Sequence, residues 1–167
     1  MNLYILRHGL AVERTIPGFK QDSDRPLTPE GRKKTRRTAA LLRRLHLSFD
    51  LILTSPFVRA AQTAAIVAEV LGAQKKSSVS HHLIPKGSLS ELVEELNASR
   101  KPLQDVLLVG HEPALSRLIS ILVTGKPGLA LELKKGGLCK LEIATLRYGR
   151  SATLQWLLTP KLSSDLR

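Results

Sequence analysis

Short apolar runs alternate along the chain with longer amphipathic stretches, and this alternation limits the possible folds more than any other feature of the sequence. The runs at 3–6, 51–53 and 106–109 have the length and composition of buried strands. The stretches between them have the apolar spacing of helices that are buried on one side. Strands that alternate with helices predict an α/β fold, in which a mostly parallel sheet is covered by helices on both faces.

The last third of the chain has a different pattern. Residues 138–144 and 152–158 alternate apolar with polar side chains, and a turn at 147–150 lies between them. This predicts an antiparallel hairpin at one edge of the sheet, and a weaker strand is predicted at 79–83. The sequence has no internal repeat and no long linker. We therefore expect a three-layer sandwich in a single domain spanning 1–167.

Local signals place four helices between and after the strands. Thr28 is a suitable N-cap for the first helix, with Pro29 at its first position. The buried stripe of that helix is predicted to consist of Thr38, Leu41, Leu42 and Leu45. Further helices are predicted from 55–56 to Gly72, from Ser88 or Ser90 to about 97, and from 112–113 onward.

Composition limits the partners. Among 167 residues, 26 are Lys or Arg and 14 are Asp or Glu, so the net charge of +12 favours an anionic partner. Nucleic acid, an acidic membrane surface or a phosphorylated substrate would each fit, although aromatic residues, at 4%, are too few for a base-stacking platform.

The single cysteine, Cys139, excludes an intrachain disulfide. No apolar run approaches the ~20 residues of a membrane span, and we expect a cytoplasmic protein.

Positively charged and imidazole side chains follow three of the predicted strands. Arg7, His8 and Gly9 come directly after the first strand, Arg59 follows the second, and His111 follows the third. Because the carboxyl ends of parallel strands meet at one edge of a sheet, where such folds bind ligands, we expect these residues to lie together.

This set of residues suits phosphoryl transfer. Arginine forks bind phosphate oxygens, and helix N-termini favour anions. A neutral imidazole is a nucleophile, and the charge of Arg7 is expected to lower the pKa of His8 and keep it neutral. Since Arg7 and Arg59 supply positive charge, no metal or other cofactor is required.

Four segments resemble one known family. LRHG at 6–9, RPLTPEG at 25–31, SPFVRAAQT at 55–63 and VGHEP at 109–113 resemble, in order, motifs of the histidine phosphatase superfamily, which includes the phosphoglycerate mutases. The short chain, without an insertion for a helical lid, resembles the SixA-type phosphohistidine phosphatases within it.

The resemblance implies a role for each site residue. His8 would attack phosphorus and carry a covalent phosphohistidine, while Gly9 would orient its ring. Arg7 and Arg59 would bind the phosphoryl oxygens, and His111 would donate to them in the transition state. A phosphate or sulfate ion would fit the same site.

The general acid stays open at this point. Larger family members use a carboxylate to protonate an alkoxide leaving group, and no spacing selects one in this chain. The candidates are Glu13, Asp22, Asp24, Glu91 and Glu112. A phosphohistidine substrate has a better leaving group and needs less acid assistance, so the lack of an acid would agree with the SixA-type interpretation.

We therefore predict a metal-independent, monomeric phosphatase that hydrolyses phosphohistidine on a signalling protein, with no nucleic acid or membrane partner. Two alternatives stay open: a small-molecule phosphomonoesterase that uses the same site, and a non-catalytic basic domain that binds nucleic acid.

Three other features have competing interpretations. The first is the basic face of the first helix. It is interpreted as a solvated surface or as a docking face for an acidic phosphoprotein, and contact with nucleic acid is a less favoured alternative. It consists of Arg32, Lys33, Arg36, Arg37, Arg43 and Arg44. His81 and His82 would point to opposite faces of a strand, which disfavours a metal role. Cys139 is expected to be inert packing.

Overall fold

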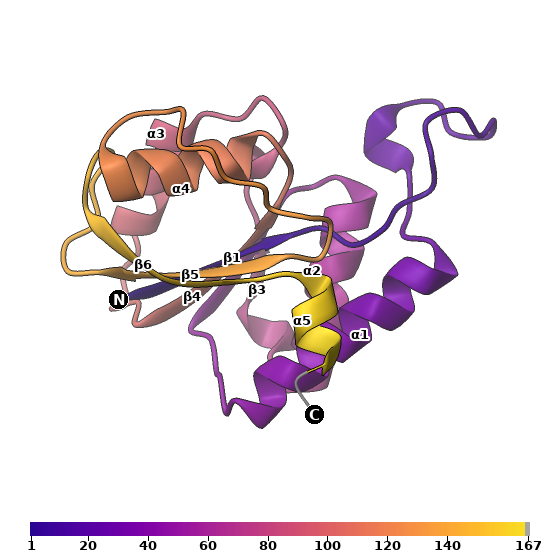
Figure 1. Ribbon diagram of the computed structural model, residues 1–167, viewed down its shortest axis with the longest axis horizontal. Coiled ribbons are helices and arrows are strands. Elements are labelled where there is room, and N and C mark those ends of the chain that lie inside the picture. Colours follow the sequence, from indigo (N-terminus) through magenta and orange to yellow (C-terminus); the bar gives the residue numbers. More distant parts are fainter. Residues whose placement is uncertain (166–167) are drawn as a thin grey trace.

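The computed structural model describes the backbone of residues 1–165 and the side chains of residues 1–162. Its centre is a six-stranded sheet with the order β3-β2-β4-β1-β5-β6 (Figure 1). The strands are β1 (Asn2–Arg7), β2 (Leu51–Thr54), β3 (Ser77–Val79), β4 (Asp105–Gly110), β5 (Leu138–Ile143) and β6 (Ala152–Leu158).

The sheet is parallel from β3 to β1 and antiparallel at β5 and β6. Arg7 at the end of β1 pairs with Gly110 at the end of β4, and Thr54 of β2 pairs with Val109. The carboxyl ends of these three strands are therefore level with one another. The predicted α/β fold class, with its antiparallel hairpin at one edge, is confirmed.

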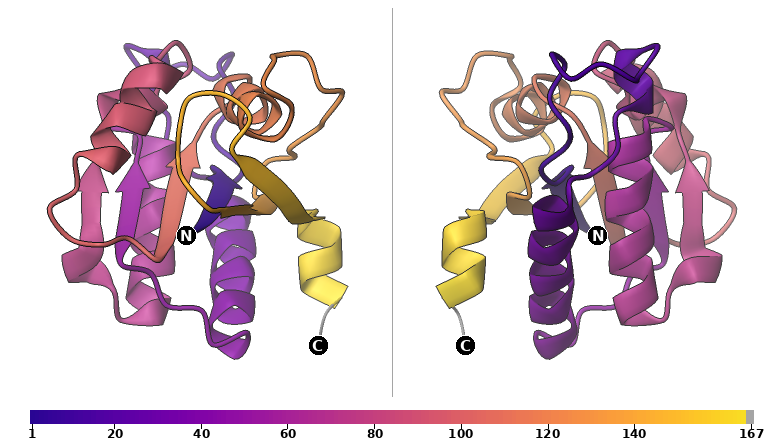
Figure 2. Two further views of the ribbon diagram at one scale, coloured as in Figure 1. Left: turned by 90° about the vertical axis from the view of Figure 1, so that its left-hand side faces the viewer. Right: turned by 90° about the vertical axis from the view of Figure 1, so that its right-hand side faces the viewer.

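Helices cover both faces of the sheet and make the molecule three layers thick (Figures 1 and 2). The helices are α1 (Pro29–Arg44), α2 (Val58–Leu71), α3 (Leu89–Asn97), α4 (Ala114–Thr124) and the short α5 (Pro160–Asp165). The apolar sides of α3 and α4 pack with one face of the sheet, and those of α1 and α2 pack with the other. No helix in the described part of the chain is long and apolar enough to cross a membrane.

The predicted caps determine where the helices begin and end. The Thr28 hydroxyl accepts a hydrogen bond from the Gly31 N–H at 3.0 Å, which satisfies one free donor at the start of α1. Gly72 ends α2 at φ 64°, a conformation that glycine adopts without strain. Ser88 caps α3 through the Glu91 N–H. Leu45, by contrast, was wrongly assigned to the buried stripe: it follows the last residue of α1 and is 48% exposed.

The segment predicted as a strand at 79–83 differs most from expectation. The strand β3 ends at Val79, and a 3-10 turn, η3 (His81–Leu83), follows it. The Ser80 hydroxyl accepts from the His82 N–H at 3.2 Å, so a side chain competes for a backbone donor that a strand would have used. The helix α2 begins two or three residues later than predicted, α4 begins one or two residues later, and α5 was not predicted.

Candidate active site

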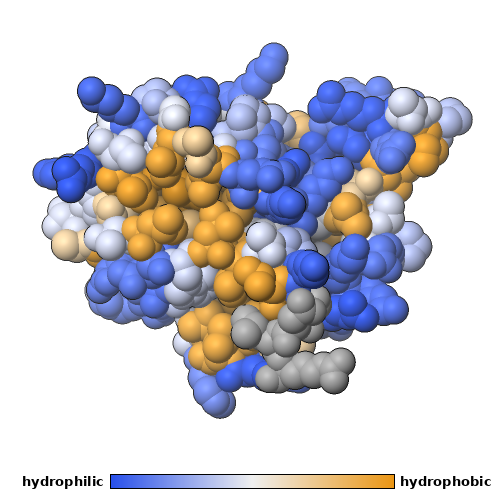
Figure 3. All heavy atoms as spheres, in the orientation of Figure 1, coloured by the Kyte–Doolittle hydropathy of each residue, from blue (hydrophilic) through white to orange (hydrophobic). Residues whose placement is uncertain are grey.

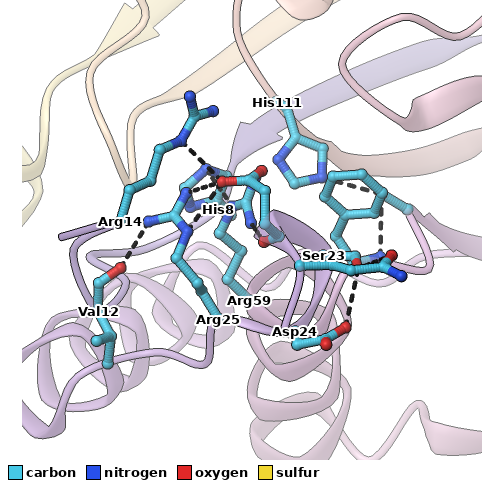
Figure 4. Close-up of polar contacts among 12 residues, drawn as sticks. His8, Val12, Arg14, Ser23, Asp24, Arg25, Arg59 and His111 are labelled. Atoms are coloured by element: carbon cyan, nitrogen blue, oxygen red, sulfur yellow. Dashed lines mark hydrogen bonds and ion pairs between the residues drawn. The ribbon is translucent and has the colours of Figure 1, made fainter. Parts of the chain in front are cut away.

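Three of the predicted site residues meet at the carboxyl edge of the sheet (Figure 4). His8 follows β1, Arg59 is the second residue of α2, and His111 follows β4. Arg59 Nε lies 3.2 Å from His8 Nε2, and the two imidazole rings are 4.9 Å apart between centroids. All three side chains are buried. Residues more than 50 positions apart in the chain therefore form one contiguous cluster.

The fourth predicted residue, Arg7, lies beside this cluster and is tied to a different segment. Its Nη1 donates to the Leu133 carbonyl at 2.9 Å, and its charge contributes to lowering the pKa of both histidines. Arg7 Nε and His111 Nδ1 are the buried side-chain nitrogen or oxygen atoms without a hydrogen-bond partner among the described residues. Such atoms are rare in folded proteins, and both belong to the predicted anion site, where an oxyanion would satisfy them.

The His8 ring is held in the tautomer that nucleophilic attack requires. Its Nδ1 lies 2.7 Å from the Gly9 carbonyl oxygen, which can only accept, so Nδ1 carries the proton and Nε2 carries the lone pair. Burial lowers the pKa of His8 to about 4; the bond to Gly9 opposes this shift, and the charges of Arg59, Arg7 and Lys135 add to it. The predicted lowering by Arg7 is present, but burial is its main cause.

His111 is held by a residue that the sequence did not single out. Its Nε2 lies 2.9 Å from the hydroxyl of Ser55, which is fully buried. That hydroxyl already accepts from the Phe57 N–H at 3.3 Å, and its own hydrogen is satisfied by donation to His111 Nε2. The proton of the neutral ring then lies on Nδ1. Burial, followed by the proximity of His8 and Arg59, lowers the pKa of His111 to about 3.

Asp22, at the start of η1 (Asp22–Asp24), binds the far side of Arg59. Its Oδ2 accepts from Arg59 Nη2 at 2.9 Å and its backbone carbonyl accepts from Nη1 at 2.6 Å, so Nε is left to face His8. Its Oδ1 accepts from Arg25 and Arg14, and Figure 4 shows these arginines converging beside His8. Burial raises the pKa of Asp22, but hydrogen bonds and charge from Arg25 and Arg59 outweigh it and lower the pKa to about 2.

An ionised Asp22 cannot protonate a leaving group at neutral pH, and the other candidate acids have different contacts. Glu112 accepts from the Ser116 N–H at 3.1 Å in the first turn of α4. Glu91 pairs with His82 at 3.2 Å, and Asp24 accepts from Ser23. Glu13 is exposed. In the described residues, none of the five carboxylates hydrogen-bonds to His8 or His111.

Gly9 lets two segments pack closely, and its backbone N–H links the chain beside His8 to α2. A Cβ there would lie 2.7 Å from Thr35 Oγ1, so only glycine lets the chain after β1 pack this closely against α1. The Gly9 N–H donates to Thr63 Oγ1 at 3.1 Å, and that hydroxyl donates to the Arg59 carbonyl at 2.7 Å. Thr63, which the sequence did not single out, thus ties the backbone beside His8 to the helical turn that carries Arg59.

Fold and site together define the class of protein. It is a mixed-sheet α/β protein whose carboxyl edge gathers two neutral imidazoles, a buried arginine and two unsatisfied donors, which is the set that phosphoryl-transfer chemistry requires.

Comparison with known proteins identifies the family. The model of the histidine phosphatase superfamily (branch 1) matches residues 3–81. An uncharacterized protein of Picosynechococcus sp. is 39% identical over 149 residues, which cover 88% of each chain. The phosphohistidine phosphatase SixA of Escherichia coli is 27% identical over 161 residues, covering 96% of this chain and 94% of SixA. The chain therefore belongs to the histidine phosphatase superfamily, a class of phosphatases.

A solved structure supports the same assignment. The structure of the protein histidine phosphatase SixA complexed with tungstate superimposes with a TM-score of 0.81 at 27% identity. The match covers 96% of this chain and 98% of that one.

Proposed function

We propose that this protein is a phosphohistidine phosphatase that uses His8 as its nucleophile and needs no metal. The observation that carries the proposal is the arrangement around His8 Nε2. Arg59 Nε donates to the lone pair of His8 Nε2 at 3.2 Å. Of the two buried nitrogens that lack a partner among the described residues, His111 Nδ1 belongs to this cluster and Arg7 Nε lies beside it. A phosphoryl group placed there would meet a nucleophile and fixed positive charge together.

The reaction proceeds in two displacements. The hydrogen bond from the Arg59 Nε–H moves from His8 Nε2 to an oxygen of the arriving phosphoryl group, and Nε2 attacks phosphorus. The bond from phosphorus to the substrate imidazole breaks, and its electron pair stays on the substrate nitrogen. That nitrogen takes a proton from water, and the hydroxide left behind is neutralised by the proton that the second step releases. A water molecule then attacks the phosphorus on His8, which releases orthophosphate and returns the neutral ring. Arg7, Arg59 and the Nδ1–H of His111 stabilise the negative charge on the phosphoryl oxygens in both steps.

Two observations support phosphohistidine over a phosphate ester as the substrate. An alkoxide leaving group requires a proton donor, whereas Asp22, with a pKa of about 2, is ionised. None of the other candidate acids hydrogen-bonds to His8 or His111 among the described residues. The SixA relative, whose name gives phosphohistidine as its substrate, matches over nearly the full length of both chains. We further propose that the substrate is a signalling protein, and that the enzyme acts as a monomer in the cytoplasm.

The test compares orthophosphate release from a phosphohistidine peptide, the matched phosphoserine peptide and a sugar phosphate, with and without EDTA. We expect kcat/KM for phosphohistidine to exceed that for the esters by at least about 100-fold, the lower range of a general acid's contribution, and EDTA to have no effect. Labelled phosphate should be trapped on the enzyme in acid-labile, base-stable form. Equal or faster turnover of the esters would instead identify a small-molecule phosphomonoesterase.

A further inference from the structure

The segment between α4 and β5 is fastened to the strand that carries the nucleophile. The Gly136 N–H lies 3.1 Å from both the Arg7 and the His8 carbonyl oxygens, and the Arg7 N–H donates to the Gly137 carbonyl at 3.0 Å. The side chain of Arg7 adds its bond to Leu133. Lys134 and Lys135, which lie between these anchor points, are exposed and held at a fixed place beside the site.

These lysines line a pocket of about 480 Å³ that shares Arg7 with the candidate active site. The pocket is formed by the 132–135 segment, the first turns of α1 and the start of α5. Hydrophilic residues cover the first turns of α1 in Figure 3. Its charged lining residues are Arg7, Lys34, Lys134, Lys135, Lys161 and one acid, Glu132. Among the described residues, five cations and one carboxylate therefore line the pocket, and Glu30 pairs with Lys34 from outside the lining.

The charges in this pocket are close enough to act on the reaction centre. Lys135 contributes to the lowered pKa of His8, although it lies more than 100 residues away in sequence. Lys34 pairs with Glu30 at 3.4 Å, whereas the described residues form no ion pair with Lys134 or Lys135. Like charges gathered in this way repel one another, and an anionic ligand relieves the repulsion.

We propose that this pocket binds acidic side chains that flank the phosphorylated residue of a protein substrate, an inference that rests on the proposed phosphatase function. The cations come from four separate parts of the chain around the pocket, so they suit several carboxylates along a peptide better than one small anion. Lysine ammonium groups bind carboxylates as point charges without a fixed geometry, which allows variation in the acidic sequence. Among the described residues, no aromatic side chain lines the pocket to stack a base, which disfavours nucleic acid as its occupant.

The experiment uses four peptides of equal length. Two carry phosphohistidine and two carry phosphoserine; within each pair, one peptide has Glu and Asp around the phosphorylated residue and the other has Gln and Asn. The wild-type protein is compared with Lys134→Glu/Lys135→Glu and with a control of identical charge change, Lys75→Glu/Lys76→Glu. The control lysines are exposed and directly precede β3, at the opposite edge of the sheet. Both kcat/KM and the binding of each labelled peptide are measured at low salt.

We expect the wild type to favour acidic flanks by about tenfold, as two or three solvent-exposed ion pairs would give, and the preference to fall with salt. Lys134→Glu/Lys135→Glu should lose the preference for acidic flanks because KM for the acidic peptide rises. Lys75→Glu/Lys76→Glu should keep this preference. Equal use of both flanks by the wild type, or the same loss in both variants, would overturn the subsite. Failure of the proposed phosphohistidine function would give a different result. The phosphoserine peptides would then be turned over faster than the phosphohistidine peptides, or none of the four peptides would be turned over. In either case, the binding measurements would still decide whether the pocket prefers acidic flanks.

Discussion

Arg59 joins two regions of the site that are built in opposite ways. On one side lie the strand ends, where His8 and His111 are buried, neutral and held by bonds to Gly9 and Ser55. On the other side lies the segment that projects beyond the sheet between β1 and α1, where Asp22 is partly exposed, ionised and held by ion pairs (Figure 1). Partly exposed ion pairs are more sensitive to salt than buried hydrogen bonds between neutral groups. We therefore expect the strand ends to carry the chemistry and the projecting segment to adjust it.

The largest effect is expected from His8→Ala, which removes the nucleophile from the buried region. We expect kcat to fall by at least about 10⁴-fold, within the range seen when a nucleophile is deleted, and the labelled phosphoenzyme to disappear. His81→Ala, at an exposed histidine in η3, is the control and should be fully active. A His8→Ala protein that keeps its fold by circular dichroism and retains phosphatase activity would show that another residue is the nucleophile.

Arg59→Ala tests the residue that the two regions share. The substitution removes the Nε–H that lies beside His8 Nε2 and the fork that binds Asp22. We expect kcat to fall by about 10²- to 10³-fold, as when one preorganised donor to the transition state is lost, with Arg59→Lys recovering only part of it because lysine lacks the fork. The control is Arg36→Ala, which removes an exposed ion pair between α1 and Glu69 of α2. Equal activity of Arg59→Ala and Arg36→Ala would contradict this role.

The neutral histidines also make a prediction about stability against pH. The pKa values of His8 and His111 lie at about 4 and about 3 in the folded protein and near 6.5 in the unfolded chain. Between these values the unfolded chain binds up to two more protons, so the free energy of unfolding should rise as pH increases from about 4 to 6.5. Asp22, whose pKa falls from 3.8 to about 2, adds a slope of the same sign that lies mainly below about pH 4, so the histidines dominate the upper part of this window.

Urea unfolding at several pH values measures this slope. A His8→Asn/His111→Asn variant should lose most of it, while the single substitutions should each lose about half. A wild-type free energy of unfolding that is flat from pH 4 to 6.5 would mean that the two imidazoles are not held neutral.

The two regions also differ in how far the sequence predicted them. His8, Arg59 and His111 each follow a short apolar strand, and the rule that parallel strands end at one edge was enough to place them together. Ser55 lies at such a strand end too, but its role depends on the direction of one hydroxyl. Asp22 lies in an irregular segment without periodicity, and its position depends on ion pairs with Arg59, 37 residues away. Long-range pairing of this kind leaves no local pattern to recognise.

Asp22→Asn, which tests the projecting segment, is expected to have the smallest effect. The amide keeps the shape of the side chain and can still accept from Arg59, but the charge that fixes the guanidinium is lost. We expect kcat to fall by about three- to tenfold, because Arg59 Nε is aimed less accurately at the phosphoryl group. KM should fall as well, because the site becomes more positive. A lower kcat together with tighter substrate binding would not follow from a general loss of structure, which would weaken both.

Asp24→Asn is the matched control, since Asp24 lies two residues further along the same turn and accepts only from Ser23 among the described contacts. Raised salt should lower the wild-type kcat toward that of Asp22→Asn, because screening weakens the ion pairs that the substitution removes, and should leave the variant nearly unchanged. If both Asn variants behave alike, or if Asp22→Asn is as inactive as Arg59→Ala, the distinction between a buried region that carries the chemistry and an ion-paired region that adjusts it is wrong.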